Sequence, residues 1–190
     1  MRRVNRGMPV ATYVKKRYGF ESVAEFEGYV ARLARHSDQA WSNAALDTAE
    51  RCWDGFVATL DDLSDDDLNR RLAAPGSNTP YALVHHCIEM TRWWLGTFGC
   101  GLDIPRDRAG EFEATGTRAD LVERIAQVRR DADVWATRML REGIAARAAR
   151  GTNADVDLDT VTPEWVLLHV VHELAQHLGQ LQVTRDLLRD

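Results

Sequence analysis

The spacing of apolar residues along the chain is helical, and the alternation of apolar and polar residues that marks strands is scarce. The pattern predicts a short amphipathic helix over residues 22–35 and a longer helix over residues 38–62. Further helices are expected over residues 79–99, over residues 117–142, and from residue 162 to the C-terminus. The sequence therefore predicts an all-α protein.

Three threonines mark the starts of the last three helices. Thr79 and Thr162 are each followed by a proline. A threonine hydroxyl accepts from a free backbone N–H, and proline at the first helical position gives up a donor that has no partner there. The first of these helices should end near Gly99. Asp120 is placed to complete a capping-box-like arrangement with Thr117.

Two long linkers separate these three helices. The first, over residues 99–116, is long for a connection within a bundle, so we expect it to form a lid or a wall of a site. The second covers residues 143–161. Four long helices joined in this way predict a four-helix bundle over residues 38–190. Residues 1–37 precede it as an N-terminal helical extension.

The composition of the chain limits its expected binding partners and its expected cellular compartment. With 190 residues and a formal net charge of −5, the chain suits one ordinary domain and matches neither nucleic acid nor an acidic membrane surface. No segment is long and apolar enough to span a bilayer. The three cysteines are an odd number without CxxC spacing, which argues against a disulfide framework and favours the reducing cytoplasm. A compact bundle of this kind is compatible with a homodimer.

Five of the six histidines lie in two short stretches that follow the threonine–proline helix starts. In the second stretch, a rotation of about 100° per residue places Glu173 and His177 with the aliphatic residues that face the core. The same rotation places His172 outward and His169 at the boundary between the two sides. This helix therefore presents a carboxylate and an imidazole to its neighbours.

In the first stretch, His86 borders the apolar side of the helix and His85 points away from it. Cys87 also rotates towards the core, where we interpret it as a small buried hydrophobe. Three aromatic residues further along this helix are candidates for lining the substrate side: Trp93, Trp94 and Phe98.

A carboxylate on the core side of a helix is costly unless a positive charge compensates it. His86, Glu173 and His177 would offer two nitrogens and one oxygen to a divalent cation, and three protein ligands leave one position open, as in catalytic zinc sites. Zinc is the first choice, and nickel, iron or manganese suit the same donors. His169 and Gln180 are candidates for orienting a ligand or relaying a proton. In the alternative interpretation, Glu173 pairs with an arginine and the histidines are structural.

Four segments of the chain resemble one family: residues 63–68, residues 75–80, Leu83-Val84-His85-His86, and residues 172–180 with the sequence HELAQHLGQ. Together they are similar to the DinB/YfiT-like superfamily, and in particular to its mycothiol-dependent branch, which resembles the N-terminal domain of the maleylpyruvate isomerases. The resemblance covers roughly residues 40–190.

The resemblance implies an up-down-down-up four-helix bundle that binds one divalent metal. It implies that His86, Glu173 and His177 match the metal ligands of the branch that has glutamate in place of a third histidine. It also implies the partners, since such relatives join a low-molecular-weight thiol, mycothiol or bacillithiol, to an electrophile.

The sequence leaves three functions open. The leading hypothesis is a metal-dependent thiol S-transferase that activates mycothiol or a similar thiol. The second is a metal-dependent hydrolase, in which the same open site activates water. The third is a non-catalytic, metal-binding bundle protein related to stress.

Overall fold

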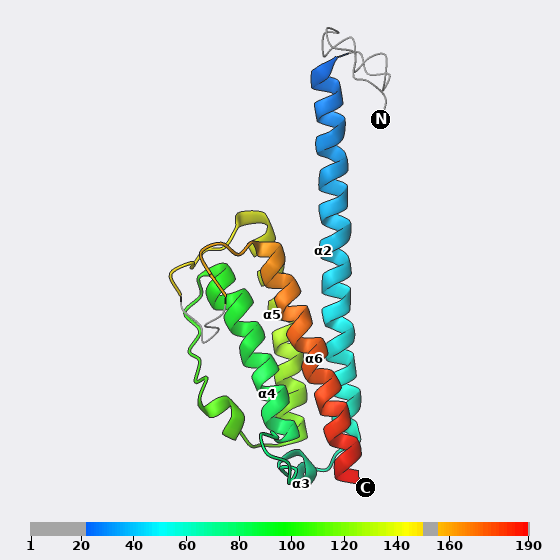
Figure 1. The fold of residues 1–190 in the computed structure, drawn as a ribbon, viewed down its shortest axis with the longest axis vertical. Helices are drawn as coiled ribbons and strands as arrows, with labels where there is room; N and C mark the ends of the chain where they lie inside the picture. The colour runs from blue at the N-terminus through cyan, green and yellow to red at the C-terminus, as the bar shows by residue number, and fades with distance from the viewer. Residues whose placement is uncertain (1–21, 150–155, 190) are drawn as a thin grey trace. The chain divides into compact units, whose positions relative to one another are not determined.

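The protein structure, a computed structural model, describes residues 22–149 and 156–189 (Figure 1). Its contacts divide the chain into two compact units, Met1–Ala44 and Ala45–Asp190. The described residues form helices and contain no strand, which confirms the all-α prediction for that part of the chain. The up-down-down-up bundle stays a prediction, as do its bounds at residues 38–190.

The first helix of the described residues, α2 (Val23–Asp61), is continuous. The predicted break between residues 35 and 38 is therefore wrong. Neither proline nor glycine occurs at residues 35–38, so no backbone feature there ends a helix, although Ser37 and Asp38 have the chemistry of capping residues. Within the second unit, α2 supplies the fully buried side chains Trp53, Phe56 and Leu60 to the core.

Three threonine caps start the other long helices, as the sequence predicts. The hydroxyl of Thr79 accepts from the backbone N–H of Ala82 at 3.1 Å and starts α4 (Pro80–Thr91). Thr117 caps α5 (Arg118–Glu142), and the hydroxyl of Thr162 caps α6 (Pro163–Arg189). The expected capping box is wrong in one respect. The Asp120 carboxylate accepts from the hydroxyl of Tyr81 on α4, so it joins two helices.

The helix that begins at Thr79 ends at Gly99, as predicted, but it changes type on the way. After Thr91, the chain continues as a π-helix, η1 (Arg92–Gly99). A Cβ on Gly96 would lie 2.5 Å from Ile104 Cδ1 and 3.3 Å from Trp135 Cζ3. The missing side chain therefore lets the following linker and α5 approach η1 closely. The linker itself carries a short 3-10 turn, η2 (Gly110–Glu113).

The packing of α4 positions the histidine stretches. α4 contacts both α5 and α6, η1 contacts the same two helices, and η2 lies against α4 (Figure 1). The fully buried side chains of this unit come from every long helix and include Leu83, Leu95, Ile125 and Leu167. The two histidine-bearing helices are thus direct neighbours over a shared apolar core.

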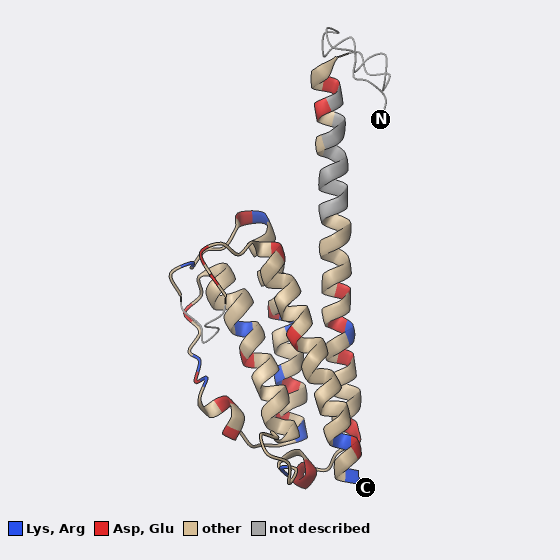
Figure 2. Ribbon diagram, in the orientation of Figure 1, with Lys and Arg blue, Asp and Glu red and all other residues tan. Residues whose placement is uncertain are grey.

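Acidic residues gather at the short helix α3 (Asp65–Leu68), coloured red in Figure 2. Some of these acidic side chains form hydrogen bonds or ion pairs with other helices. The Asp65 carboxylate accepts from the backbone N–H of Arg118 at 2.8 Å, and Asp62 pairs with Arg185 at 3.1 Å. The cluster therefore serves helix starts and inter-helix contacts.

We expect Thr79→Ala to lower the free energy of unfolding by about 1 kcal/mol, because the first turn of α4 loses its side-chain acceptor. Thr79→Ser keeps the hydroxyl and is the matched control, with a much smaller effect. Urea unfolding of the three proteins measures the difference. Equal stability of the alanine and serine variants would show that the cap contributes nothing.

Candidate metal centre

His86, Glu173 and His177 come together where α4 packs against α6. Each offers one ligand atom, a ring nitrogen or a carboxylate oxygen, and these atoms all lie within 4.8 Å of one another. His86 is 4% exposed, and the side chains of Glu173 and His177 are 22% and 12% exposed. The structure thus brings all three predicted ligand residues to one largely buried place that solvent still reaches.

The two rings and the carboxylate face one another without an arginine between them. His177 Nε2 lies 3.6 Å from Glu173 Oε2. The centroids of the His86 and His177 rings are 4.9 Å apart, with the ring planes nearly perpendicular at 86°. Within residues 22–149 and 156–189, no arginine forms an ion pair with Glu173. The alternative interpretation, an arginine neutralising this carboxylate, is therefore wrong for the described residues.

The surroundings set the protonation states that metal ligands require. The contact with His177 holds the pKa of Glu173 below its usual range, against the opposing effect of burial. Burial lowers the pKa of His86, although the Glu111 carboxylate opposes the shift. An ionised carboxylate and a neutral imidazole are the forms that bind divalent cations.

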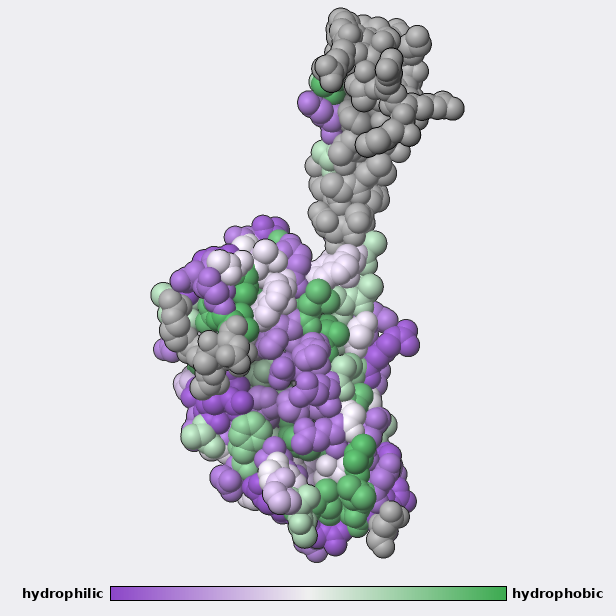
Figure 3. All heavy atoms as spheres, viewed as in Figure 1, coloured by the Kyte–Doolittle hydropathy of each residue, from purple (hydrophilic) through white to green (hydrophobic). Residues whose placement is uncertain are grey.

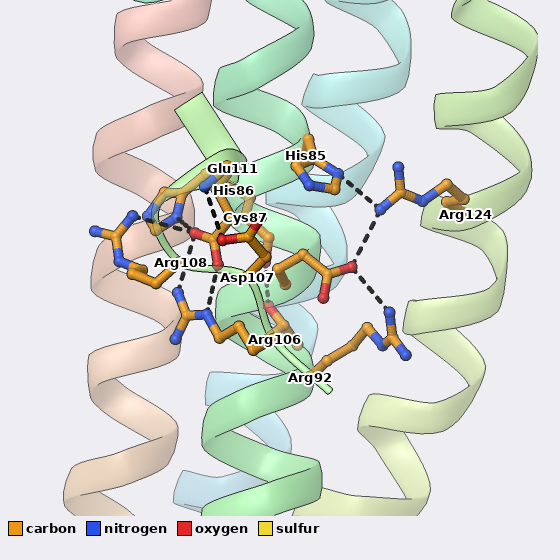
Figure 4. A network of polar contacts seen from close by, with 12 residues as sticks. His85, His86, Cys87, Arg92, Arg106, Asp107, Arg108, Glu111 and Arg124 are labelled. Atoms are coloured by element: carbon orange, nitrogen blue, oxygen red, sulfur yellow. Dashed lines mark hydrogen bonds and ion pairs between the residues drawn. The ribbon is translucent and has the colours of Figure 1, made fainter. Parts of the chain in front are cut away.

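A buried carboxylate from the linker over residues 99–116 contacts the Nδ1 atom of His86. Glu111 in η2 is 1% exposed, and its Oε2 lies 2.7 Å from His86 Nδ1. Arg106 donates to Oε1 from Nε at 2.5 Å and to Oε2 from Nη2 at 3.1 Å. Arg108 donates to Oε2 from Nη1 at 3.1 Å. Figure 4 shows both arginines converging on Glu111 beside the His86 ring.

Sequence reasoning missed Glu111, Arg106 and Arg108. The only signal for them was the length of the linker over residues 99–116, which we expected to form a lid or a wall. Two arginines followed by a glutamate within six residues are common on exposed loops, so their spacing alone does not indicate a buried cluster. The cluster arises because η2 packs against α4.

Gln180 lies next to the site, as the rotation along α6 predicts. Its Oε1 is 3.1 Å from His177 Nδ1. Each candidate ligand histidine therefore has an oxygen acceptor beside its Nδ1 atom.

The remaining histidines of the two stretches lie outside the three-residue cluster. His172 is exposed, as predicted. His85 accepts at Nδ1 from Arg124 of α5 at 2.7 Å. The His169 ring stacks on Trp165 with centroids 4.9 Å apart and meets the edge of Trp94 at 4.7 Å. His169 thus lies one turn before Glu173 among aromatic rings.

The aromatic residues proposed for the substrate side are buried, and Trp94 also contacts Trp165 and His169 of α6. Trp93 stacks on Phe98 with centroids 5.6 Å apart, and Trp94 meets the edges of both rings. A separate cavity of about 450 Å³ lies within the second unit, with Trp53, Leu95 and Leu174 among its lining residues. None of the three candidate ligands lines it. On the face drawn in Figure 3, hydrophilic side chains cover the middle of α6.

A family model described as mycothiol S-transferase matches residues 46–190. The chain belongs to this family. The match spans most of the chain and confirms the resemblance to the DinB-like, mycothiol-dependent proteins. No curated protein and no solved structure matches the chain significantly. Among the described helices of this family member, none is long and apolar enough to cross a membrane.

The thiols of this mycothiol S-transferase family member are poorly suited to act as its nucleophile. Cys52, Cys87 and Cys100 are all free and buried. Burial raises the pKa of each thiol, most strongly that of Cys87, which is in line with its interpretation as a buried hydrophobe. A thiolate is the reactive form of cysteine, so burial disfavours the reactive form of all three side chains.

We expect Glu111→Gln to lower the free energy of unfolding by roughly 3 kcal/mol at pH 7, because both arginines lose a buried counter-charge. Burial raises the pKa of Glu111, but the contacts with His86 and Arg106 outweigh it and lower the pKa from 4.5 to about 2. The unfolded chain therefore takes up this proton first as the pH falls.

The stabilisation is complete above about pH 4.5 and is lost as the pH falls through about 2. Urea unfolding of wild type and Glu111→Gln at several pH values should show the gap narrowing over that range. A gap that is constant down to pH 2 would contradict the buried ion pair.

Proposed function

We propose that this chain is a metal-dependent thiol S-transferase whose divalent cation is held by His86, Glu173 and His177. The observation that carries the proposal is the convergence of their ligand atoms within 4.8 Å, in a chain of the mycothiol S-transferase family. The proposed co-substrates are a low-molecular-weight thiol, with mycothiol first, and a small electrophile.

The residues fit a divalent cation by their chemistry. Two imidazoles and one carboxylate form a donor set that zinc accepts, and nickel, iron and manganese accept it too. The carboxylate has no arginine partner within the described part of the chain, so a cation would supply the missing charge. Three protein donors leave a coordination position for a substrate. We propose zinc first on this basis.

A bound divalent cation would lower the pKa of a thiol at that position and so supply thiolate at neutral pH. The thiol proton would leave to solvent or a nearby base, and the sulfur lone pair would form the new bond to the electrophilic carbon. The electron pair of the bond broken at that carbon would depart with a leaving group, or would move onto the neighbouring atom when the electrophile carries a double bond. Glu173 contributes a permanent negative charge, and His86 contributes a ring kept neutral by burial. His169, one turn before Glu173, is the candidate to receive the proton, and Gln180 orients His177.

The proposal extends to the setting of the reaction. The family match supports a catalytic bundle within residues 46–190. A bundle over residues 38–190 with residues 1–37 as an extension stays a prediction. The three free cysteines and a thiol co-substrate support the cytoplasm as the compartment. A homodimer stays a prediction.

We expect wild-type protein purified without a histidine tag to hold about one divalent ion per chain. His177→Ala should lose most of this metal, because one of three donors is gone. His172→Ala, an exposed histidine on the same helix, is the matched control and should keep it. Elemental analysis of the three proteins decides the point. Unchanged metal content in His177→Ala would remove this residue from the site.

We expect the metal-loaded protein to consume a model electrophile only when a thiol such as mycothiol is present. The rate should fall on removal of metal with a chelator and return when metal is added back. Loss of the electrophile can be followed by absorbance with and without thiol. Turnover without any thiol would indicate a hydrolase. A metal-free protein with no gain in melting temperature on adding zinc would indicate a non-catalytic bundle.

A further inference from the structure

Each proposed ligand histidine has its Nδ1 atom beside an oxygen, but the two oxygens differ in kind. His177 Nδ1 faces an amide oxygen of Gln180 at 3.1 Å, near solvent. His86 Nδ1 faces a carboxylate oxygen of Glu111 at 2.7 Å, in a buried place. The stronger constraint therefore acts on His86.

Arg106 and Arg108 determine whether Glu111 or His86 carries the proton of their shared hydrogen bond. Arg106 and Arg108 occupy both carboxylate oxygens, and a guanidinium only donates hydrogen bonds and does not give up its proton. With its charge held by two arginines, the carboxylate acts as an acceptor. The proton of the short contact therefore resides on His86 Nδ1, and the ring lone pair resides on Nε2.

The face of the same ring is also fixed. Phe112, the neighbour of Glu111 in η2, lies against the His86 ring with centroids 5.1 Å apart. The Arg108 guanidinium lies over the Phe112 ring, with its Cζ atom 4.6 Å from the ring centroid. One short turn thus controls both the rotation of the imidazole and its tautomer.

Glu111 and Glu173 differ in their partners. Glu111 has both oxygens bound by arginines, and it is not among the side chains whose ligand atoms converge. Glu173 has only the His177 ring as its ion-pair partner within the described residues. Glu111 can therefore act on a cation only through His86.

We propose that Glu111 is a positioning residue that fixes His86 as the Nδ1–H tautomer and presents its Nε2 to the metal, with Arg106 and Arg108 holding the carboxylate in that role. This inference rests on the proposed metal site. A negatively charged acceptor on Nδ1–H also makes Nε2 a stronger donor, and loss of such a partner weakens metal binding by about 10–100-fold.

The first test is made on the wild-type network and needs no metal. Nitrogen-15 NMR of the imidazole side chains in metal-free wild-type protein distinguishes the two neutral tautomers, and His86→Gln identifies the signals of this ring. We expect the Nδ1–H tautomer at neutral pH. The Nε2–H tautomer, or a rapid mixture of both, would overturn the proposal.

The second test measures zinc affinity by competition with a coloured chelator. Glu111→Gln keeps the shape of the side chain and removes its charge, and we expect zinc to bind about 10–100-fold more weakly. Glu113→Gln is the matched control in the same turn. Glu113 is exposed and lies near Arg71, so the zinc affinity of the Glu113→Gln variant should equal that of wild type.

Equal affinities of Glu111→Gln and wild type, or an equal loss in Glu113→Gln, would overturn the proposal. If wild type itself binds no zinc, the proposed function fails, while the tautomer measurement still tests whether the His86 ring carries its proton on Nδ1, as its contact with Glu111 requires. If Glu111→Gln does not fold, the tautomer measurement decides alone.

Discussion

A carboxylate on the packed side of a helix must meet a compensating positive charge, and this requirement organises the contact between α4 and α6. Glu173 faces two imidazoles and, in the described part of the chain, no arginine. Burial lowers the pKa of His86 and so favours its neutral ring, which does not supply the missing charge. The described protein groups therefore leave the negative charge of Glu173 without a full counter-charge, and a divalent cation is the simplest group that would supply one.

The rotation of residues along a helix was enough to predict which side chains converge. Two helices with well-marked starts at Thr79 and Thr162 each have an apolar side, and the inward positions follow from about 100° per residue. On that basis His86, Glu173 and His177 were expected inside and His172 outside, and the structure places them so. Local capping chemistry fixes where each helix begins, and this fixes the rotation.

Other features depend on contacts that no local pattern encodes. The continuity of α2 through residues 35–38 was missed because serine and aspartate also occur inside helices, so their presence is only a weak signal of a helix end. The π-helix η1 was missed because such segments are rare and occur within otherwise α-helical stretches, so a helical pattern of apolar residues predicts an α-helix there. The position of Glu111 follows from the path of a linker with little regular structure, and η2 reaches α4 only through tertiary packing.

Glu111 and Glu173 show how neighbouring side chains give different roles to chemically identical groups. Glu111 pairs with Arg106 and Arg108, so the protein balances its negative charge. Its carboxylate also accepts a hydrogen bond from Nδ1 of His86. Glu173 meets imidazoles, so its charge remains available to a ligand. If Glu173 had arginine neighbours as Glu111 does, their positive charge would lie beside the proposed cation position and would repel a cation. The linker that carries Arg106 and Arg108 therefore belongs to the site as much as the two helices do, although it contributes none of the three converging atoms.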